Sequence, residues 1–221
     1  MNYQWDFSFL LNYKHVLLEG LVNTLVLSLS VLIGGLFIGT LVAACRTSNS
    51  KVFRAIGSTY VELLRNLPAL VLLFWFYYTI PVLTGIQNGR FLTATIAFSL
   101  YTGAYFGEIF RSGIQSIDRG QWEASKALGM PARTIFASII MPQAIRRTLP
   151  SLTNEAIEVI KISAFAATIA YPDALYQAKL ISDTEYRPVE AYTAVAAMLT
   201  AVILILSALS YALELKFRKS N

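Results

Sequence analysis

The sequence predicts an all-α integral membrane protein with about five transmembrane helices. Apolar residues make up 56% of the 221 residues and charged residues only 14%, well below the roughly 25% charged residues usual in soluble domains. The apolar residues form long blocks, and a hydrocarbon core about 30 Å thick needs roughly 20 apolar helical residues. Lys and Arg lie mostly between the blocks, as in cytoplasmic membrane loops. The net charge of +5 is therefore interpreted as loop charge, and no nucleic-acid partner is expected.

Five segments are long and apolar enough to span a bilayer. They are approximately residues 21–44, 59–83, 91–110, 151–171 and 191–213. The first and the last carry no charge, and Glu108 lies near the end of the third. Glu62 and Arg65 lie in the first two turns of the second segment, where Pro68 is expected to kink the helix.

The connections between these segments predict the orientation, because cytoplasmic loops carry an excess of Lys and Arg. One set of connections holds twelve cations, which are Arg46, Lys51, Arg54, Arg111, Arg119, Lys126, Arg133, Arg146, Arg147, Lys216, Arg218 and Lys219. The other set holds four, which are Lys14, Arg90, Lys179 and Arg187. The N-terminus is therefore predicted outside and the C-terminus in the cytoplasm. This gives an extracytoplasmic segment over residues 1–19, a transmembrane domain over 20–213 with a cytoplasmic loop at 111–150, and a cytoplasmic tail over 214–221.

No internal repeat is visible, so the two-halves pattern of many secondary transporters is missing. Five helices can hardly enclose a regulated polar pathway alone. A second, symmetric or pseudo-symmetric membrane subunit is therefore expected.

The cytoplasmic loop contains two short amphipathic patterns. The apolar residues that define them are Trp122, Ala127, Leu128, Ile135, Phe136, Ile139 and Ile140. The patterns are separated at Gly129 and Pro131; glycine suits the end of a helix and proline the first turn of the next. The loop is thus predicted to hold a small helix on a rigid turn, parallel to the membrane. Such a helix could be gripped by a soluble motor domain, or it could rest on lipid headgroups.

A spaced motif in this loop resembles that of a known family. Permease subunits of bacterial type I importers of the ATP-binding-cassette (ABC) class carry E-A-A, three residues, G, nine residues, then I-x-L-P. This sequence has Glu123, Ala124 and Ser125, then Gly129, then Ile139 to Pro142. Ser125 replaces an alanine, and Met141 replaces a leucine.

Further stretches resemble the polar amino-acid branch of that family. They are G-L-V-N-T-L-V-L-S at 20–28, Y-V-E-L-L-R-N-L-P at 60–68, A-Y-F-G-E-I-F-R-S-G-I-Q-S at 104–116, G-Q-W-E-A at 120–124 and M-P-Q-A-I-R at 141–146. The resemblance implies a type I ABC importer transmembrane domain in a bacterial inner membrane. It also implies two cytoplasmic subunits that bind ATP and Mg, a second permease subunit (identical or homologous), and an extracytoplasmic solute-binding protein.

The resemblance assigns the coupling to the ATPase subunits to the motif residues. These are Glu123, Ala124, Ser125, Gly129, Ile139 and Pro142. Glu123 is expected to cap or pin the coupling helix, and Gly129 to permit the close turn. Closure of an ATPase dimer would then move this helix together with the adjoining third and fourth spans.

Polar residues on the fourth span are candidates for the translocation path, because charged residues within a membrane usually face a cavity or a partner. Asn154, Glu158 and Lys161 recur at helical spacing and share one face. Lys161 would bind a solute carboxylate and Glu158 an ammonium group. The alternative is that Glu158 and Lys161 neutralise each other and only set packing.

Other polar groups complete this candidate path. Glu155 and Ser163 lie on the same segment, and Tyr101 and Tyr105 lie four apart on the third span, where packing or interface anchoring is the alternative.

The residue after Lys161 bears on the solute. Relatives often have K-D-T-S-L where this sequence has Lys161 followed by Ile162. Loss of an acidic group favours a neutral or acidic amino acid, or a derivative, over a cationic one.

Two further pairs are predicted from spacing. Glu62 and Arg65 are three apart near the cytoplasmic surface, which predicts an inner-gate or interfacial pair. Gly35 and Gly39 are four apart, which allows close helix contact.

The sequence contains no catalytic motif. A Walker-type Gly-Lys-Ser/Thr loop is missing, so ATP hydrolysis is expected from a partner and no cofactor from this chain. His15 and Cys45 are the only residues of their kinds, too few for a usual metal site. The competing interpretation is a self-contained ion-coupled secondary carrier or channel with Glu158 as its coupling acid; the patterned cytoplasmic loop favours the importer.

Overall fold

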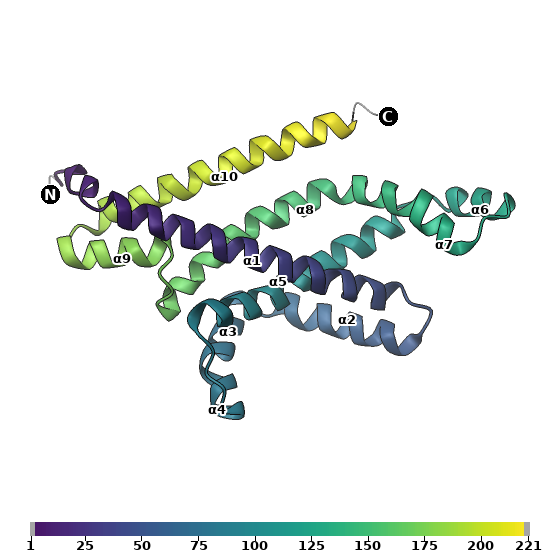
Figure 1. Ribbon diagram of the computed structural model, residues 1–221, viewed down its shortest axis with the longest axis horizontal. Helices are drawn as coiled ribbons and strands as arrows, with labels where there is room; N and C mark the ends of the chain where they lie inside the picture. The colour runs from purple at the N-terminus through teal and green to yellow at the C-terminus, as the bar shows by residue number, and fades with distance from the viewer. Residues whose placement is uncertain (1–2, 219–221) are drawn as a thin grey trace. The chain divides into compact units, whose positions relative to one another are not determined.

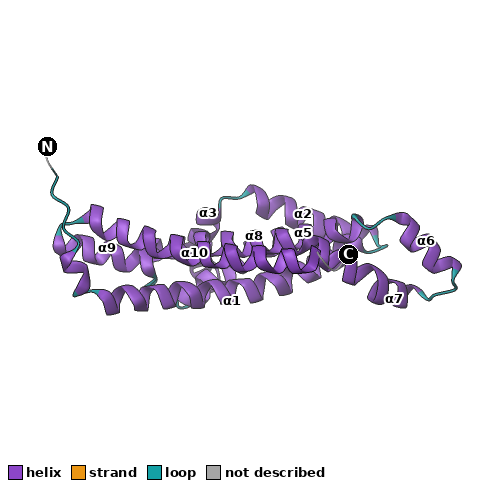
Figure 2. Cartoon of the chain, turned by 90° about the horizontal axis from the view of Figure 1, so that it is seen from above, coloured by secondary structure: helices purple, strands orange, loops and turns teal. Residues whose placement is uncertain are grey.

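The computed structural model describes residues 3–218, and side chains up to residue 212. Helices joined by short loops make up this part of the chain, and no strand occurs in it (Figures 1 and 2). The helices are α1 Lys14–Thr47, α2 Lys51–Asn66, α3 Ala69–Phe74, α4 Ile80–Thr84, α5 Arg90–Gln115, α6 Arg119–Ala127, α7 Ala132–Thr134, α8 Met141–Ser163, α9 Ala174–Glu185 and α10 Pro188–Arg218. Short 3-10 segments occupy Ser8–Leu11 and Ala164–Ile169, and π-helical segments occupy Trp75–Thr79 and Ile135–Ile140.

The chain forms two compact units. Unit 1 comprises Met1–Leu32, Pro68–Phe98 and Ile157–Ala208, and unit 2 comprises Ile33–Leu67, Ser99–Ala156 and Leu209–Asn221. The long helices α1, α5, α8 and α10 contribute residues to both units. The last predicted segment, the tail 214–221, extends beyond the described residues from 219 onward.

The sequence predicts five spans, but fewer of the described helices meet the length and hydropathy expected of a span. Two described helices, Lys14–Thr47 and Pro188–Ala212, are long and apolar enough to cross a membrane by themselves. The pair Lys51–Asn66 and Ala69–Thr84 qualifies as a third if it counts as one interrupted span. The helices α5 and α8 are present but more polar. The count of five spans and the outside position of the N-terminus therefore stay predictions.

The second predicted span, residues 59–83, is not one continuous helix. Helix α2 ends at Asn66, and Leu67 and Pro68 are extended, with ψ values of 136° and 131°. The residue before a proline is pushed out of the helical region by the proline ring, and proline has no N–H to continue the helix. Pro68 therefore breaks this helix, where the sequence suggested only a kink.

The fourth predicted span, residues 151–171, also has other limits. Helix α8 begins ten residues earlier, at Met141, and ends at Ser163, after which the chain tightens into the 3-10 segment Ala164–Ile169. That segment ends at Ala170, which has a left-handed φ of 57°. The first half of α8 is polar, so hydrophobic blocks alone did not reveal where it starts.

The core of unit 1 lies where α9 packs against the first turns of α1 and α10. It is formed by the buried side chains Leu17, Ala174, Ala178, Ile181, Ala191 and Val195. Asp173 caps the N-terminus of α9, its Oδ1 accepting a 2.7 Å hydrogen bond from the Tyr176 N–H. The Asp173 side chain is fully buried, and its Oδ2 has no hydrogen-bond partner among the described residues.

Burial raises the pKa of Asp173 from 3.8 to about 7, against the opposing effect of backbone N–H donors at its carboxylate. Asp173 lies outside the predicted spans, after residue 171. Because its folded-state pKa is the higher one, the folded protein holds the proton more tightly, and stability is lost as pH rises from about 4 to about 7. Asp173→Asn keeps the cap and should remove this loss, at most about 4 kcal/mol at neutral pH, since one pKa unit corresponds to about 1.4 kcal/mol. Thermal unfolding in detergent across that pH range checks it, and parallel pH curves for the two proteins would contradict it.

In unit 2, α1 and α5 approach closely at glycines, as the small-residue spacing predicted. A Cβ atom at Gly35 would lie 2.3 Å from Thr102 Oγ1, and one at Gly39 would lie 2.5 Å from Phe106 Cβ. At Gly39 the backbone nitrogen of Gly107 is also only 3.0 Å away. The prediction of a close helix contact at this pair is confirmed.

Gly39→Ala should therefore destabilise the protein, because the new Cβ would meet the Phe106 Cβ and the α5 backbone and not the flexible end of a side chain. Overpacking of this kind costs about 1–2 kcal/mol. The midpoint of thermal unfolding of the purified protein is the measurement. Gly89→Ala is the control, since a Cβ there would meet nothing within 4 Å. Equal midpoints for both variants would contradict the close contact.

Candidate functional site

The predicted coupling element is a short, well-capped helix. Helix α6 comprises Arg119–Ala127, and Asp118 is its N-cap. The Oδ1 of Asp118 accepts a 2.6 Å hydrogen bond from the Gly120 N–H. At its end, the Gly129 N–H donates to the Lys126 carbonyl and the Met130 N–H to the Ser125 carbonyl, at 2.9 and 3.2 Å. This pair of bonds is the Schellman motif, which closes a helix with a left-handed residue.

Gly129 supplies that residue, with a φ of 72°. No atom lies within 4 Å of the place that a Cβ would take at this position. The left-handed backbone conformation, and not crowding, therefore explains why a glycine occupies it. The sequence predicted this turn correctly. Pro131 is displaced by one position: it is the N-cap of α7 and not a residue of its first turn.

The second predicted helix of the loop is not a separate short helix. From Ala132 the chain runs through the π-helical segment Ile135–Ile140 directly into α8. Buried side chains hold the element together: Ile117, Ile135, Ile140 and Ala144 form a cluster, against which Trp122, Met130 and Ile139 pack. Figure 2 shows the loop between α6 and α7.

The motif residues divide into an outward and an inward group. Glu123, Ala124, Gly129 and Pro142 are exposed. Ile139 is half-buried, and Ser125 is only 4% exposed.

The Ser125 hydroxyl donates to the Gln121 carbonyl at 2.6 Å. The serine that replaces the family's alanine therefore satisfies its own polar group within the helix.

The sequence suggested that Glu123 caps or pins α6. In the structure Asp118 caps α6, and Glu123 does not. In the described part of the chain, the Glu123 carboxylate makes no hydrogen bond or ion pair, and it stands exposed near the middle of the helix. An exposed carboxylate on a rigid helix is available to a partner surface.

A polar cavity in unit 2, called the inner cavity here, brings charged residues of three helices together. Its volume is about 370 Å³, and its lining is Arg46, Val61, Glu62, Arg65, Asn66, Tyr105 and Glu108. Arg46 comes from the last turn of α1, Tyr105 and Glu108 from α5, and the others from the second half of α2.

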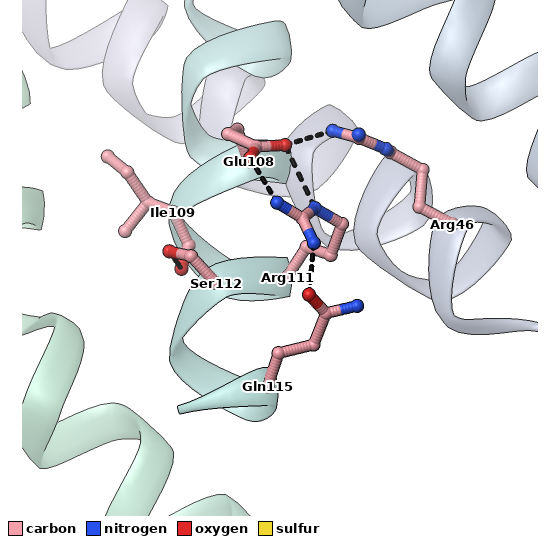
Figure 3. A network of polar contacts seen from close by, with 6 residues as sticks. All are labelled: Arg46, Glu108, Ile109, Arg111, Ser112 and Gln115. Atoms are coloured by element: carbon pink, nitrogen blue, oxygen red, sulfur yellow. Dashed lines mark hydrogen bonds and ion pairs between the residues drawn. The ribbon is translucent and has the colours of Figure 1, made fainter. Parts of the chain in front are cut away.

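Glu108 is the centre of a network on one side of this cavity (Figure 3). Its carboxylate accepts hydrogen bonds from Arg46 and from Arg111, the Arg111 Nε bond measuring 3.0 Å. Arg111 also donates to the side chain of Gln115. The side chains of Arg46, Arg111 and Glu108 are 16%, 22% and 25% exposed, so water screens these pairs only in part. The network ties α1 to α5.

The predicted pair of Glu62 and Arg65 does not form. Both line the inner cavity, but the Arg65 guanidinium lies over the Tyr105 ring, 5.2 Å from its centre. The Tyr105 hydroxyl is 3.0 Å from that of Tyr101. An exposed ion pair gains little, and a cation over an aromatic face gains a similar energy. Tyr105, predicted for the solute path, thus lies with the candidate gate residues.

Arg46 and Glu108 were missing from the predicted site. The sequence holds one sign of each: Glu108 lies within the apolar block 91–110, and Arg46 follows the apolar block 21–44. Pairing them required knowledge of how α1 and α5 pack.

The candidate path residues of α8 are placed as follows. The Lys161 Nζ lies 2.5 Å from Glu158 Oε1, and both side chains are about half exposed. Glu158 and Lys161 therefore form the ion pair that the alternative interpretation expected, and the pair lies on an accessible face of α8. Asn154 is exposed and Glu155 half-buried.

Ser163 departs from this group. Its side chain is fully buried, donating to the Ile160 carbonyl and accepting from the Ser28 hydroxyl of α1. It contributes to packing and offers no accessible hydroxyl.

Known proteins share this arrangement of helices. The family model described as binding-protein-dependent transport system inner membrane component matches residues 35–219. A glutamine transport system permease named GlnP from Rickettsia bellii (strain RML369-C) is 38% identical over 183 residues, 81% of this chain and 84% of that protein. The arginine transport system permease protein ArtQ of Bacillus subtilis (strain 168) is 32% identical, with 98% of this chain and 99% of that protein covered.

Among solved structures, an amino acid ABC transporter crystallised with histidines has a chain with a TM-score of 0.92 at 33% identity. The match covers 97% of this chain and all of that one.

With these matches, this chain, which is helical in its described part and has long apolar helices, is a multi-pass membrane component of a transport system. More specifically, the chain belongs to the family of inner membrane components of binding-protein-dependent transport systems. The resemblance inferred from the loop motif is thereby confirmed.

Proposed function

We propose that the chain is the permease subunit of an ABC importer for a polar amino acid. Its relatives over nearly the whole length are named as amino-acid permeases, and the family match carries the proposal. The complete assembly contains two cytoplasmic subunits that bind ATP and Mg and perform the hydrolysis. It also contains a second permease subunit and an extracytoplasmic solute-binding protein. The named structural relative is itself a transporter of the ABC class.

Helix α6 is the coupling helix of this assembly. Its cap at Asp118 and its closing turn at Gly129 hold it as one rigid piece. The cluster of Ile117, Ile135 and Ile140 packs it against the start of α8. A force on the exposed face of α6 is therefore passed into α8, because packed side chains move together.

The inner cavity is the inner gate. Glu62 and Arg65 have no ion-pair partner among the described residues, and Arg65 is free to leave the Tyr105 ring. The Glu108 network beside them holds α1 and α5 together while these two side chains rearrange.

The solute is a neutral polar amino acid, with glutamine as the first candidate. Lys161 can bind a carboxylate and Glu158 an ammonium group after their mutual pair opens. No second acid follows Lys161, since residue 162 is isoleucine. One relative is named for glutamine and another for arginine. A panel of radiolabelled amino acids separates these classes, and arginine as the preferred solute would overturn the neutral assignment.

The function itself is tested by purification and reconstitution. The tagged chain is expressed in the cells from which its gene comes, so that its own partner subunits can be present, and is then extracted in detergent. Copurification of an ATP-hydrolysing subunit, and amino-acid uptake that requires internal ATP, are the expected results. Full uptake by the purified chain alone in liposomes with an ion gradient would instead support the competing secondary carrier.

A further inference from the structure

The segment before α1 is fixed to unit 1 through one buried carboxylate. Glu190, in the first turn of α10, is fully buried. Its Oε2 accepts a 2.5 Å hydrogen bond from the Tyr3 hydroxyl, and its Oε1 accepts from the Asp6 N–H at 3.2 Å and from Arg187 at 2.9 Å. A second attachment lies further along, where the Tyr13 hydroxyl donates to Glu185 at 2.5 Å. The segment thus has a defined position.

Three aromatic rings project from this fixed segment. Tyr3 and Trp5 meet edge to face at 5.6 Å, and Trp5 and Phe7 stack at 5.7 Å between ring centres. The three rings at positions 3, 5 and 7 thus form one continuous aromatic group. The rings nevertheless stay 43–58% exposed, and Leu11 is 73% exposed.

The position of the rings relative to the candidate spans indicates what covers them. The segment leads directly into α1 and is fixed to the first turn of α10, and these are the two described helices that can each cross a membrane alone. Leu18 and Val22, on one face of the first turns of α1, are also exposed and apolar. Exposed apolar side chains therefore occur both on the start of the span and in the segment that precedes it. Trp and Tyr gather at the level of lipid headgroups, where an apolar ring with a polar edge is best solvated.

We propose that Tyr3, Trp5, Phe7 and Leu11 form an interfacial anchor that lies in the headgroup region of the bilayer. The polar attachments to Glu190 face the protein, and the rings face lipid. The anchor fixes the height of the first turns of α1 and α10 relative to the membrane surface. This holds on whichever side of the membrane the N-terminus lies, and it does not depend on the transported solute.

Fluorescence of Trp5 tests the anchor. The sequence has three tryptophans, so Trp75→Phe and Trp122→Phe leave Trp5 as the only reporter in the full chain. The protein is placed in lipid nanodiscs whose phosphatidylcholine carries bromine near the headgroup end of its acyl chains. We expect most of the Trp5 emission to be quenched by this lipid, less by lipid brominated near the chain ends, and little by acrylamide in the water.

Two further proteins serve as controls. Adding Trp5→Phe removes the last tryptophan and gives the blank. Leu128→Trp in that blank places a reporter at the exposed end of α6, and it should be quenched by acrylamide and not by the brominated lipids.

A second reporter protects the test against a local effect of one position. Phe7→Trp in the blank should behave as Trp5 does, because the two rings stack on the same side. Emission like that of tryptophan in water, with strong acrylamide quenching and none by brominated lipid, would overturn the proposal. The same holds if the rings become protected only when a solute-binding protein is added, since the patch would then be a protein docking surface.

Discussion

Replacing Glu123 with alanine should reduce ATP-driven uptake about tenfold or more while the chain still folds and inserts. The carboxylate is exposed and makes no hydrogen bond or ion pair with the described part of its own chain, so folding should lose little. A charged hydrogen bond to a docked ATPase subunit is worth about 1.5–3 kcal/mol, which is roughly tenfold to hundredfold in docking affinity. Uptake in proteoliposomes and the amount of ATPase subunit that copurifies are the two measurements.

Glu19→Ala is the matched control, because Glu19 is also exposed and also has no hydrogen bond or ion pair within the described residues. Its uptake and copurification should stay at the level of the unchanged protein. If Glu123→Ala equals this control in both measurements, α6 does not contact the motor subunit through this residue.

Replacing Glu108 with alanine should lower the free energy of unfolding by about 3 kcal/mol. The change leaves the guanidinium groups of Arg46 and Arg111 without their shared carboxylate. Removing one member of a buried ion pair costs about 3–5 kcal/mol, and the lower end applies here because the side chains are partly exposed. Thermal unfolding in detergent measures the loss.

Glu62→Ala is the comparison at the same cavity. Its carboxylate belongs to no ion pair in the described structure, so the stability should change by less than about 0.5 kcal/mol. Adding Arg46→Ala to Glu108→Ala should cost less than the sum of the single changes, since both remove the same bond. Strict additivity would show that Arg46 and Glu108 do not interact.

The features that the sequence predicted well depend on short spacings. The turn at Gly129 requires a residue that tolerates positive φ. Gly35 and Gly39, on one face of α1, allow α5 to pack closely against that face. Both are local rules, and both agree with the structure. The motif from Glu123 to Pro142 likewise has a fixed spacing, and the family that it indicated is the family whose model matches the chain; the coupling role of its residues stays a prediction.

The features that were missed depend on contacts between distant residues or on unusual helical turns. Arg46 and Glu108 are 62 residues apart, and no spacing rule links them. Ile135 and Ile140 are five apart and both buried, a pattern that an α-helix of 3.6 residues per turn does not produce. The π-helical turn brings them to one side, and π-turns have no reliable sequence signature.

Because α2 ends at Asn66, its last carbonyl groups need hydrogen-bond partners from outside the helix. The last carbonyl groups of a helix have no partner within it, and inside lipid each such group costs several kcal/mol. The predicted span 59–83 puts this helix end within the bilayer, and the Asn66 Nδ2 reaches the carbonyl of Glu62, at 2.7 Å, which lies one turn before the unpartnered carbonyls. Glu62, Arg65 and Asn66, all in the final turns of α2, line the inner cavity. In the proposed gate, water in the inner cavity would reach this helix end, so that drying out the cavity would remove hydrogen-bond partners from α2 as well as close the proposed route for solute.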